Sequence, residues 1–220
     1  LEDEAPKVRS EAFRTFWAWH GEDPLVAIDR ALLARFADLR ARAVSELVTL
    51  AKPKDNPSAA PALERLHKTV EDRDGAVATA AYEALVELEG KETTRAHVTA
   101  MGTLHPKLRV LAAKNAVHAP VELVRSALVK QLQDEDAPAR TQALETLDKL
   151  LPKESGPLYA AIQSSHLDLR VRAAELLANR RDEQLIDAMR GLLADKDLER
   201  RLPPEVLVPL RRRAATALAS

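Results

Sequence analysis

The chain lacks cysteine and has few glycines and aromatic residues. Its 220 residues include no Cys, six Gly, two Trp, two Tyr and three Phe. Without Cys, disulfides, thiolate metal sites and cysteine nucleophiles are excluded. So few Gly leave little material for tight catalytic loops, and no Gly-rich phosphate loop, Gly-x-Ser-x-Gly elbow or HExxH motif occurs. We therefore expect no catalytic residue, no cofactor and no metal.

The chain also lacks an excess of either charge and any long apolar run. It has 33 basic and 34 acidic residues, so no global charge favours nucleic acid or an anionic membrane. No apolar run approaches the roughly 18 residues that cross a bilayer, and no signal peptide pattern opens the chain. We expect a cytoplasmic protein without a membrane partner. Because the first residue is Leu and not Met, we expect a piece of a longer protein or a processed chain.

What the chain does contain is an internal repeat: an aliphatic residue, Arg, two residues, Ala, and an apolar residue four positions later. The second position of its seven copies is occupied by Arg9, Arg40, Ala78, Arg109, Arg140, Arg170 and Arg211, at steps of 31, 38, 31, 31, 30 and 41 residues. Self-similarity at this period is typical of a solenoid. The apolar residues are mainly Ala and Leu, which favours close-packed helices over sheets.

Each copy has the spacing of one helix face, and a second amphipathic segment precedes it. We predict an all-α fold, an α-α superhelix of about six helix pairs after one leading helix, forming a single domain over residues 1–220. The predicted pairs are 24–36 with 38–51, 59–71 with 75–89, 93–102 with 106–118, 121–133 with 137–150, 157–165 with 167–180, and 183–194 with 209–219. Two Pro-containing loops, 52–57 and 195–208, account for the two long steps.

The repeat resembles HEAT repeats, most closely the short bacterial kind related to phycobilisome lyases. The resemblance is carried by the period near 31, by Pro or Asp at the entry of the second helix, and by its Val-Arg-x-x-Ala opening. The clearest copies are Asp3 to Ala12 and Asp134 to Leu144. The resemblance covers essentially the whole chain. It implies the fold more specifically than the function, because such arrays carry many unrelated roles.

The resemblance also implies a structural role for the repeated Arg residues. HEAT repeats often place an acidic residue six positions before this Arg, in a hydrogen-bonded ladder along the inter-repeat turns. Asp3, Asp134 and Glu205 stand at this spacing. We predict that the ladder residues are half-buried, paired and structural, and not ligand contacts: Arg9, Arg40, Arg109, Arg140, Arg170 and Arg211. A buried Arg without partners would cost several kcal/mol.

Four of the seven aromatic residues crowd into the leading helix. The repeat register predicts that its core-facing residues are Val8, Ala12, Phe16 and Trp19. Phe13 and Trp17 then lie on an adjacent stripe. One interpretation is that this helix packs against a further helix upstream. The other is an aromatic patch that binds a partner chain, since aromatic residues are enriched at binding hot spots.

The leading functional hypothesis is a non-catalytic protein–protein interaction or scaffold module, whose second helices line a concave surface. The partner would be another protein or another domain of the same parent chain. Besides Phe13 and Trp17, the candidate contacts are outward residues of successive second helices: Arg42, Glu46, Glu83, Glu87, Lys114, Glu145, Lys149 and Glu175.

Two alternatives remain open from the sequence. The first is a nucleic-acid-associated module that uses the Arg-rich C-terminal half: Arg172, Arg180, Arg181, Arg190, Arg200, Arg201, Arg211, Arg212 and Arg213. Acidic residues interleave with this set and no aromatic residue follows Tyr159, which favours a solvated, ion-paired surface. The remote third is a HEAT-like DNA glycosylase, but the two Trp residues lie far from the basic half.

Overall fold

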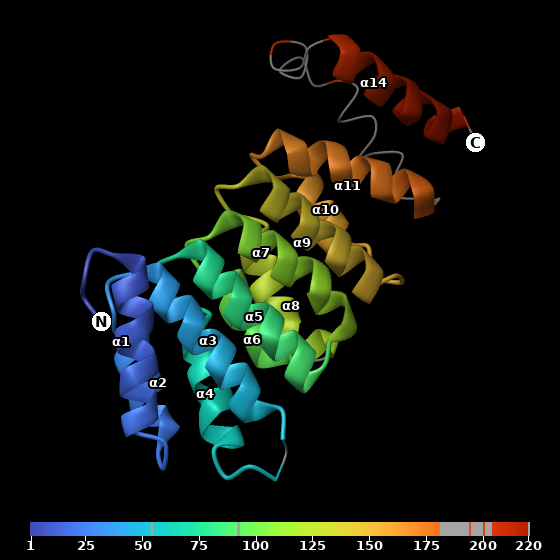
Figure 1. Ribbon diagram of the computed structural model, residues 1–220. Coiled ribbons are helices and arrows are strands. Elements are labelled where there is room, and N and C mark those ends of the chain that lie inside the picture. Colours follow the sequence, from blue (N-terminus) through green and yellow to red (C-terminus); the bar gives the residue numbers. More distant parts are fainter. Residues whose placement is uncertain (54, 92, 181–193, 195–199, 201–203, 220) are drawn as a thin grey trace. The chain divides into compact units, whose positions relative to one another are not determined.

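A computed structural model describes the chain except for residues 54, 92, 181–193, 195–199, 201–203 and 220. The described residues contain helices and no strand. They form two compact units, Leu1–Val124 and Arg125–Ser220, which we describe separately. The predicted fold class, an all-α array of helix pairs of the α-α superhelix type, is confirmed (Figure 1). That residues 1–220 form a single domain stays a prediction.

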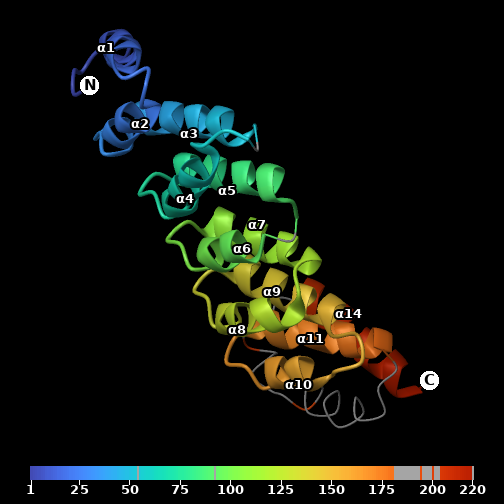
Figure 2. The same cartoon turned by 90° about the horizontal axis from the view of Figure 1, so that it is seen from below.

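The first unit contains three helix pairs after a leading helix. We call the first helix of a pair the A helix and the second the B helix. The B helices are α1 (Pro6–Trp19), α3 (Ala37–Ala51), α5 (Gly75–Glu89) and α7 (Pro106–Asn115), and the A helices are α2 (Pro24–Leu32), α4 (Ala59–Thr69) and α6 (Thr94–Met101). Each A helix packs on the B helix of its own pair. In Figures 1 and 2 the A and B helices of this unit form two layers.

The second unit continues the alternation. A short 3-10 turn, η1 (Ala116–His118), precedes α8 (Val121–Gln131), and the boundary between the units falls inside α8. The helices that follow are α9 (Ala137–Leu150), α10 (Gly156–Ile162), α11 (Leu167–Arg180) and α14 (Pro204–Ala219). α10 packs on both α9 and α11.

The prediction for the last pair is partly wrong. Its B helix begins at Pro204 and not at residue 209, so the end of the predicted loop 195–208 is helical. Pro is accepted in the first turn of a helix, where its missing N–H would have had no partner, so Pro204 begins this helix. The predicted segment 183–194 lies outside the described residues apart from residue 194, which is helical.

The core consists of columns in which one repeat position is buried in successive B helices. The Ala of the repeat is at most 1% exposed at Ala43, Ala81, Ala112, Ala143 and Ala173, and the apolar residue four positions later is fully buried at Leu47, Leu85, Leu147 and Leu177. A column of Ala allows neighbouring helices to approach closely, which explains how a chain with so few aromatic residues can fill its interior.

Candidate partner-binding surface

Arg40 is buried, and its hydrogen bonds connect its own repeat to the next one. Its Nη1 donates hydrogen bonds to the carbonyls of Ala34 and Arg35, at 2.9 Å each. Its Nε and Nη2 donate to the carboxylate of Asp72 at 2.8 and 3.1 Å. The side chains of Arg40 and Asp72 are only 4% and 9% exposed. We call this arrangement, two carbonyls before the helix and one carboxylate from the next repeat, the arginine clamp.

The clamp recurs at Arg9, which donates to the carbonyls of Asp3 and Glu4 and to the carboxylate of Asp38. It recurs again at Arg140, which donates to the carbonyls of Asp134 and Glu135 and to the carboxylate of Asp168. Arg109 is half-buried and donates to the carbonyl of Thr103 at 3.0 Å. Arg170 and Arg211 are half-buried too. A structural role for all six Arg residues stays a prediction.

The acceptors differ from those that the resemblance implies. The residue six positions before the Arg contributes its backbone carbonyl to the clamp, and its own carboxylate closes the turn instead. Asp134 Oδ1, for example, accepts from the Asp136 backbone N–H at 2.8 Å. The clamp carboxylate comes from the next repeat, at one of two positions. Asp38, which binds Arg9, stands two positions before Arg40, whereas Asp72, which binds Arg40, stands six positions before Ala78. No single spacing therefore identifies it in the sequence.

A histidine takes the place of the Arg that is missing at position 78 of the repeat. His105, from the following repeat, places Nε2 at 2.7 Å from the carbonyl of Asp72, the acceptor that an Arg at position 78 would take. Its ring also lies against Gly75, where an added Cβ would come within 3.0 Å of Nδ1. Ala78 itself is fully buried. The missing Arg is thus replaced by a side chain from another repeat, which the repeat alignment alone does not reveal.

The predicted register of α1 is wrong. Phe13 is buried at 4% exposure, whereas Val8 and Trp19 are 50% and 78% exposed. The residue four positions after the second position of the repeat is buried in the five copies that follow as well, at Val44, Tyr82, Ala113, Leu144 and Ala174. Phe13 belongs to this apolar column, so it is a core residue and not a partner contact. The same apolar position recurs in the sequence, and this recurrence identifies the buried side of α1.

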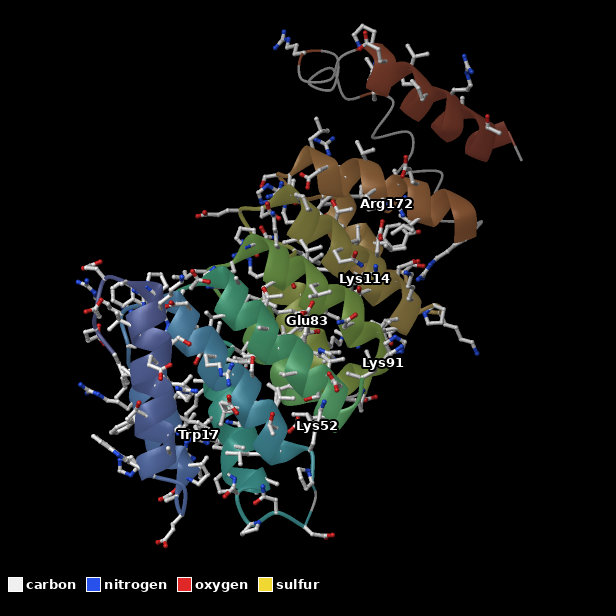
Figure 3. The ribbon with its side chains drawn as sticks, in the orientation of Figure 1. Trp17, Lys52, Glu83, Lys91, Lys114 and Arg172 are labelled. Carbon is white, nitrogen blue, oxygen red and sulfur yellow. The ribbon has the colours of Figure 1, made fainter. Side chains whose placement is uncertain are left out.

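Trp17 remains partly exposed on the B-helix layer, where its ring lies 5.9 Å from that of Phe13 (Figure 3). The equivalent residues of the next three repeats are also half-buried and apolar: Val48, Val86 and Val117. Trp17 therefore begins a shallow apolar row between successive B helices of the first unit.

The predicted charged contacts of the first unit divide into paired and free groups. Arg42 and Glu46 form an ion pair at 2.7 Å within α3, and Glu87 pairs with Lys52 at 3.3 Å. Glu83 and Lys114 are exposed and form no ion pair or hydrogen bond with any described residue. They occupy the same repeat position on the neighbouring helices α5 and α7. We call the exposed side of α3, α5 and α7 the B face.

In the second unit the two predicted acidic contacts, Glu145 and Glu175, are both bonded to Arg172. Arg172 donates to Glu145 at 2.7 Å and to Glu175 at 2.8 Å, which ties α9 to α11. These two carboxylates are only 28% and 23% exposed. Lys149 is exposed. The free charges of the predicted site therefore lie mainly on the B face of the first unit.

A buried polar network lies behind the B face. The Tyr82 hydroxyl and His97 Nδ1 are 2.9 Å apart, Asn115 donates to the same hydroxyl at 3.1 Å, and His97 Nε2 lies 2.8 Å from the Lys91 carbonyl. Tyr82 and His97 are fully buried. A neutral His97 with its proton on Nε2 satisfies every bond: it donates to Lys91 and accepts from Tyr82. Burial raises the pKa of Tyr82 to about 12 and lowers the pKa of His97 below its ordinary 6.5.

This network predicts a loss of stability on mild acidification. Because the folded chain lowers the pKa of His97, the unfolded chain binds the proton more readily, and stability falls as the pH drops below about 6.5. We expect urea midpoints to decrease between about pH 7.5 and pH 5, and to decrease less in His97→Gln, which has no proton to take up. Equal decreases in both chains would assign the effect to other groups.

The A helices carry a groove on their exposed side, but its charged groups are largely engaged. Between α2 and α4, Arg65 donates to both carboxylate oxygens of Asp29, at 2.6 and 2.7 Å. Glu64 accepts two hydrogen bonds from Arg95, which lower the pKa of this carboxyl group to about 2. Of the six charged residues that line the groove, four are bonded within the protein and two, Lys68 and Glu71, are exposed. The groove therefore offers a weaker site than the B face.

The described residues contain no cluster of three or more His, Asp or Glu side chains that could hold a metal ion. Within the same residues, no helix is both long and apolar enough to cross a bilayer.

No family model matches the chain, and no curated protein shows significant sequence similarity to it. Among solved structures, an engineered protein from a structural genomics programme is 18% identical, covers 87% of this chain and 95% of its own, and has a TM-score of 0.40. A designed armadillo repeat protein is also 18% identical, with coverages of 87% and 98% and a TM-score of 0.40.

Proposed function

We propose that this chain is a non-catalytic binding module of the HEAT type, and that the B face of its first unit holds a segment of another protein or of another domain of its parent chain. The observation that carries the proposal is the pair Glu83 and Lys114. Two opposite charges stand on neighbouring helices at one repeat position, exposed and without partners, while most other charges around them are paired.

The spacing of the helices suits an extended polypeptide. Packed helices are about 8–10 Å apart. A segment in the extended polyproline II conformation has three residues per turn and advances about 3.1 Å per residue, so every third side chain points to the same side about 9 Å further along, at the next helix. A basic residue opposite Glu83 and an acidic residue about three positions away opposite Lys114 would pair with both. The half-buried row of Val48, Val86 and Val117 would offer apolar contact beside them.

The nucleic-acid alternative receives less support from the described residues. Arg172 is bonded to two carboxylates, and Arg180 is bonded to Asp148 and to backbone carbonyls within the second unit. Arg181, Arg190 and Arg201 lie outside the described residues. Phosphate binding needs several free cations on one face, and these Arg side chains are already engaged.

A charge-exchange experiment tests the proposed face. Peptides selected from a display library against the intact chain are expected to lose about tenfold or more in affinity to the double variant Glu83→Lys with Lys114→Glu, measured by fluorescence anisotropy. The matched control is Lys68→Glu with Glu71→Lys, which exchanges two exposed charges beside the A-helix groove and also conserves net charge. Peptides that respond to the control and not to the B-face variant would contradict the proposal. Salt-dependent binding of a labelled DNA duplex would favour the alternative.

A further inference from the structure

The two free charges of the B face stand next to a hydrogen bond that joins their helices. Glu83 follows Tyr82 in α5, and Lys114 precedes Asn115 in α7. Asn115 Nδ2 donates to the Tyr82 hydroxyl at 3.1 Å. This bond therefore connects the two helices one residue away from each free charge, and Figure 3 shows Glu83 and Lys114 on these neighbouring helices.

The bond between α5 and α7 depends on His97 of α6, a helix that packs against both. The Tyr82 hydroxyl donates its one proton to His97 Nδ1, 2.9 Å away, while His97 Nε2 donates to the Lys91 carbonyl at 2.8 Å. Because its proton points to His97, the hydroxyl offers a lone pair to the Asn115 amide. Tyr82 and His97 are both fully buried, so water does not replace a bond that is lost.

A proton on His97 is incompatible with this arrangement. The imidazolium carries an N–H on both ring nitrogens, so Nδ1 no longer accepts from the Tyr82 hydroxyl. With the Asn115 amide oriented as it is, the hydroxyl proton would then lie between two donors. The hydroxyl therefore loses its bond to His97 or its bond to Asn115, and a buried polar group without a partner destabilises the arrangement.

The surroundings of His97 oppose its protonation. Burial lowers the pKa of His97 most, the bond to the Lys91 carbonyl raises it, and the charge of His118 in η1 lowers it. Glu89, the carboxylate at the end of α5, lies 2.9 Å from His67 Nε2 and is engaged there. Once the network opens, the pKa of His97 returns toward its ordinary 6.5, so mild acid favours the open form.

We propose that this network fixes the spacing between Glu83 and Lys114, and that the B face releases its bound segment when His97 is protonated. This regulation rests on the proposed function of the B face. A segment that pairs with both charges needs α5 and α7 at a fixed separation, and opening the network removes the bond that maintains it. The coupling is reciprocal, so a bound segment makes His97 harder to protonate by the same factor by which protonation weakens binding.

Peptide affinity at two pH values tests the proposal. A display-selected peptide without His, whose binding requires Glu83 and Lys114, should bind the parent chain about fivefold or more weakly at pH 5.5 than at pH 7.5, measured by fluorescence anisotropy. The peptide's own carboxylates keep their charge, because their ordinary pKa is about 4. His97→Gln offers an acceptor and a donor but no titrating proton, so it should bind equally at both pH values. The matched controls are His67→Gln, at a second buried histidine, and His118→Gln, at an exposed one, and both should keep the pH dependence.

A parent chain that binds such a peptide equally at both pH values would overturn the proposal. So would a pH dependence that persists in His97→Gln or disappears in either control. Peptides whose affinity ignores the exchange of Glu83 and Lys114 would instead overturn the proposed function, and this regulation with it.

Two further measurements do not require His97→Gln to fold. Tyr82→Phe keeps the ring but lacks the hydroxyl, so at pH 7.5 it should bind the peptide as weakly as the parent chain does at pH 5.5. In NMR titrations of the histidine rings, the midpoint of His97 should fall when the peptide saturates the chain, by the amount that matches the pH dependence of the affinity. Parent-like affinity of Tyr82→Phe, or a His97 midpoint that rises or stays in place on binding, would contradict the proposal.

Discussion

Replacing Arg40 with Ala is expected to lower the free energy of unfolding by about 3–5 kcal/mol. The substitution leaves the Asp72 carboxylate, 9% exposed, without its cation, and removes the bridge between α3 and the turn that precedes α5. The comparison is Arg42→Ala, two residues along the same helix, whose side chain is 64% exposed and whose ion pair with Glu46 should contribute about 1 kcal/mol or less. Urea denaturation followed by circular dichroism measures both.

A double-variant cycle sharpens this prediction. Arg40→Met with Asp72→Leu removes both charges, so it should cost clearly less than the sum of the two single replacements. If Arg40→Ala were no more damaging than Arg42→Ala, the clamp would be incidental to stability. If the double variant cost the full sum, the two residues would not be energetically coupled.

Truncating Tyr82 to Ala is expected to cost about 3–5 kcal/mol, because the ring is fully buried between neighbouring repeats. Tyr82→Phe separates the hydroxyl from the ring. It leaves His97 Nδ1 and the Asn115 amide without their shared partner, so about 1–3 kcal/mol of the loss should persist. Urea unfolding at neutral pH gives both values. A Phe variant as stable as the parent would show that the network only fills space.

Much of the fold could be predicted from the sequence because the same helical pattern occurs in seven copies. Helices α3, α5 and α9 begin and end within one residue of the predicted bounds. The Pro-rich segment after α3 is a loop, as expected. Periodicity was sufficient here because each buried column uses the same residue types at the same position, so that seven weak signals agree.

The failures arose where a residue's environment comes from a different repeat. The repeat register places Phe13 beside the face that meets an A helix, whereas the buried side of α1 packs against α2 and α3 of the next repeat. The clamp carboxylates come from residues 28 to 32 positions after their Arg, at two different register positions. Likewise, only the fold shows that His105 stands in for the Arg missing at Ala78.

For the candidate site, the sequence predicted the exposed side of the B helices but not which individual residues on it are free. The sequence identified the outward residues of the B helices, but not which of them are already paired. Arg42 and Glu46 satisfy each other, Glu145 and Glu175 share Arg172, and Glu83 and Lys114 are left free. Those pairings depend on side-chain reach across neighbouring helices, which spacing along the chain does not specify.

The central claim is that the B face of α3, α5 and α7 contacts a polypeptide. Site-specific photo-crosslinking in the cell that makes the protein tests it most directly, with a photoreactive residue at exposed Ser45 on the B face and, for comparison, at exposed Ala60 on the A helix α4. We predict one recurrent polypeptide adduct from position 45, absent from position 60 and lost when Glu83→Lys and Lys114→Glu are introduced. Equal adducts from both positions, or an adduct that survives the charge exchange, would contradict the claim.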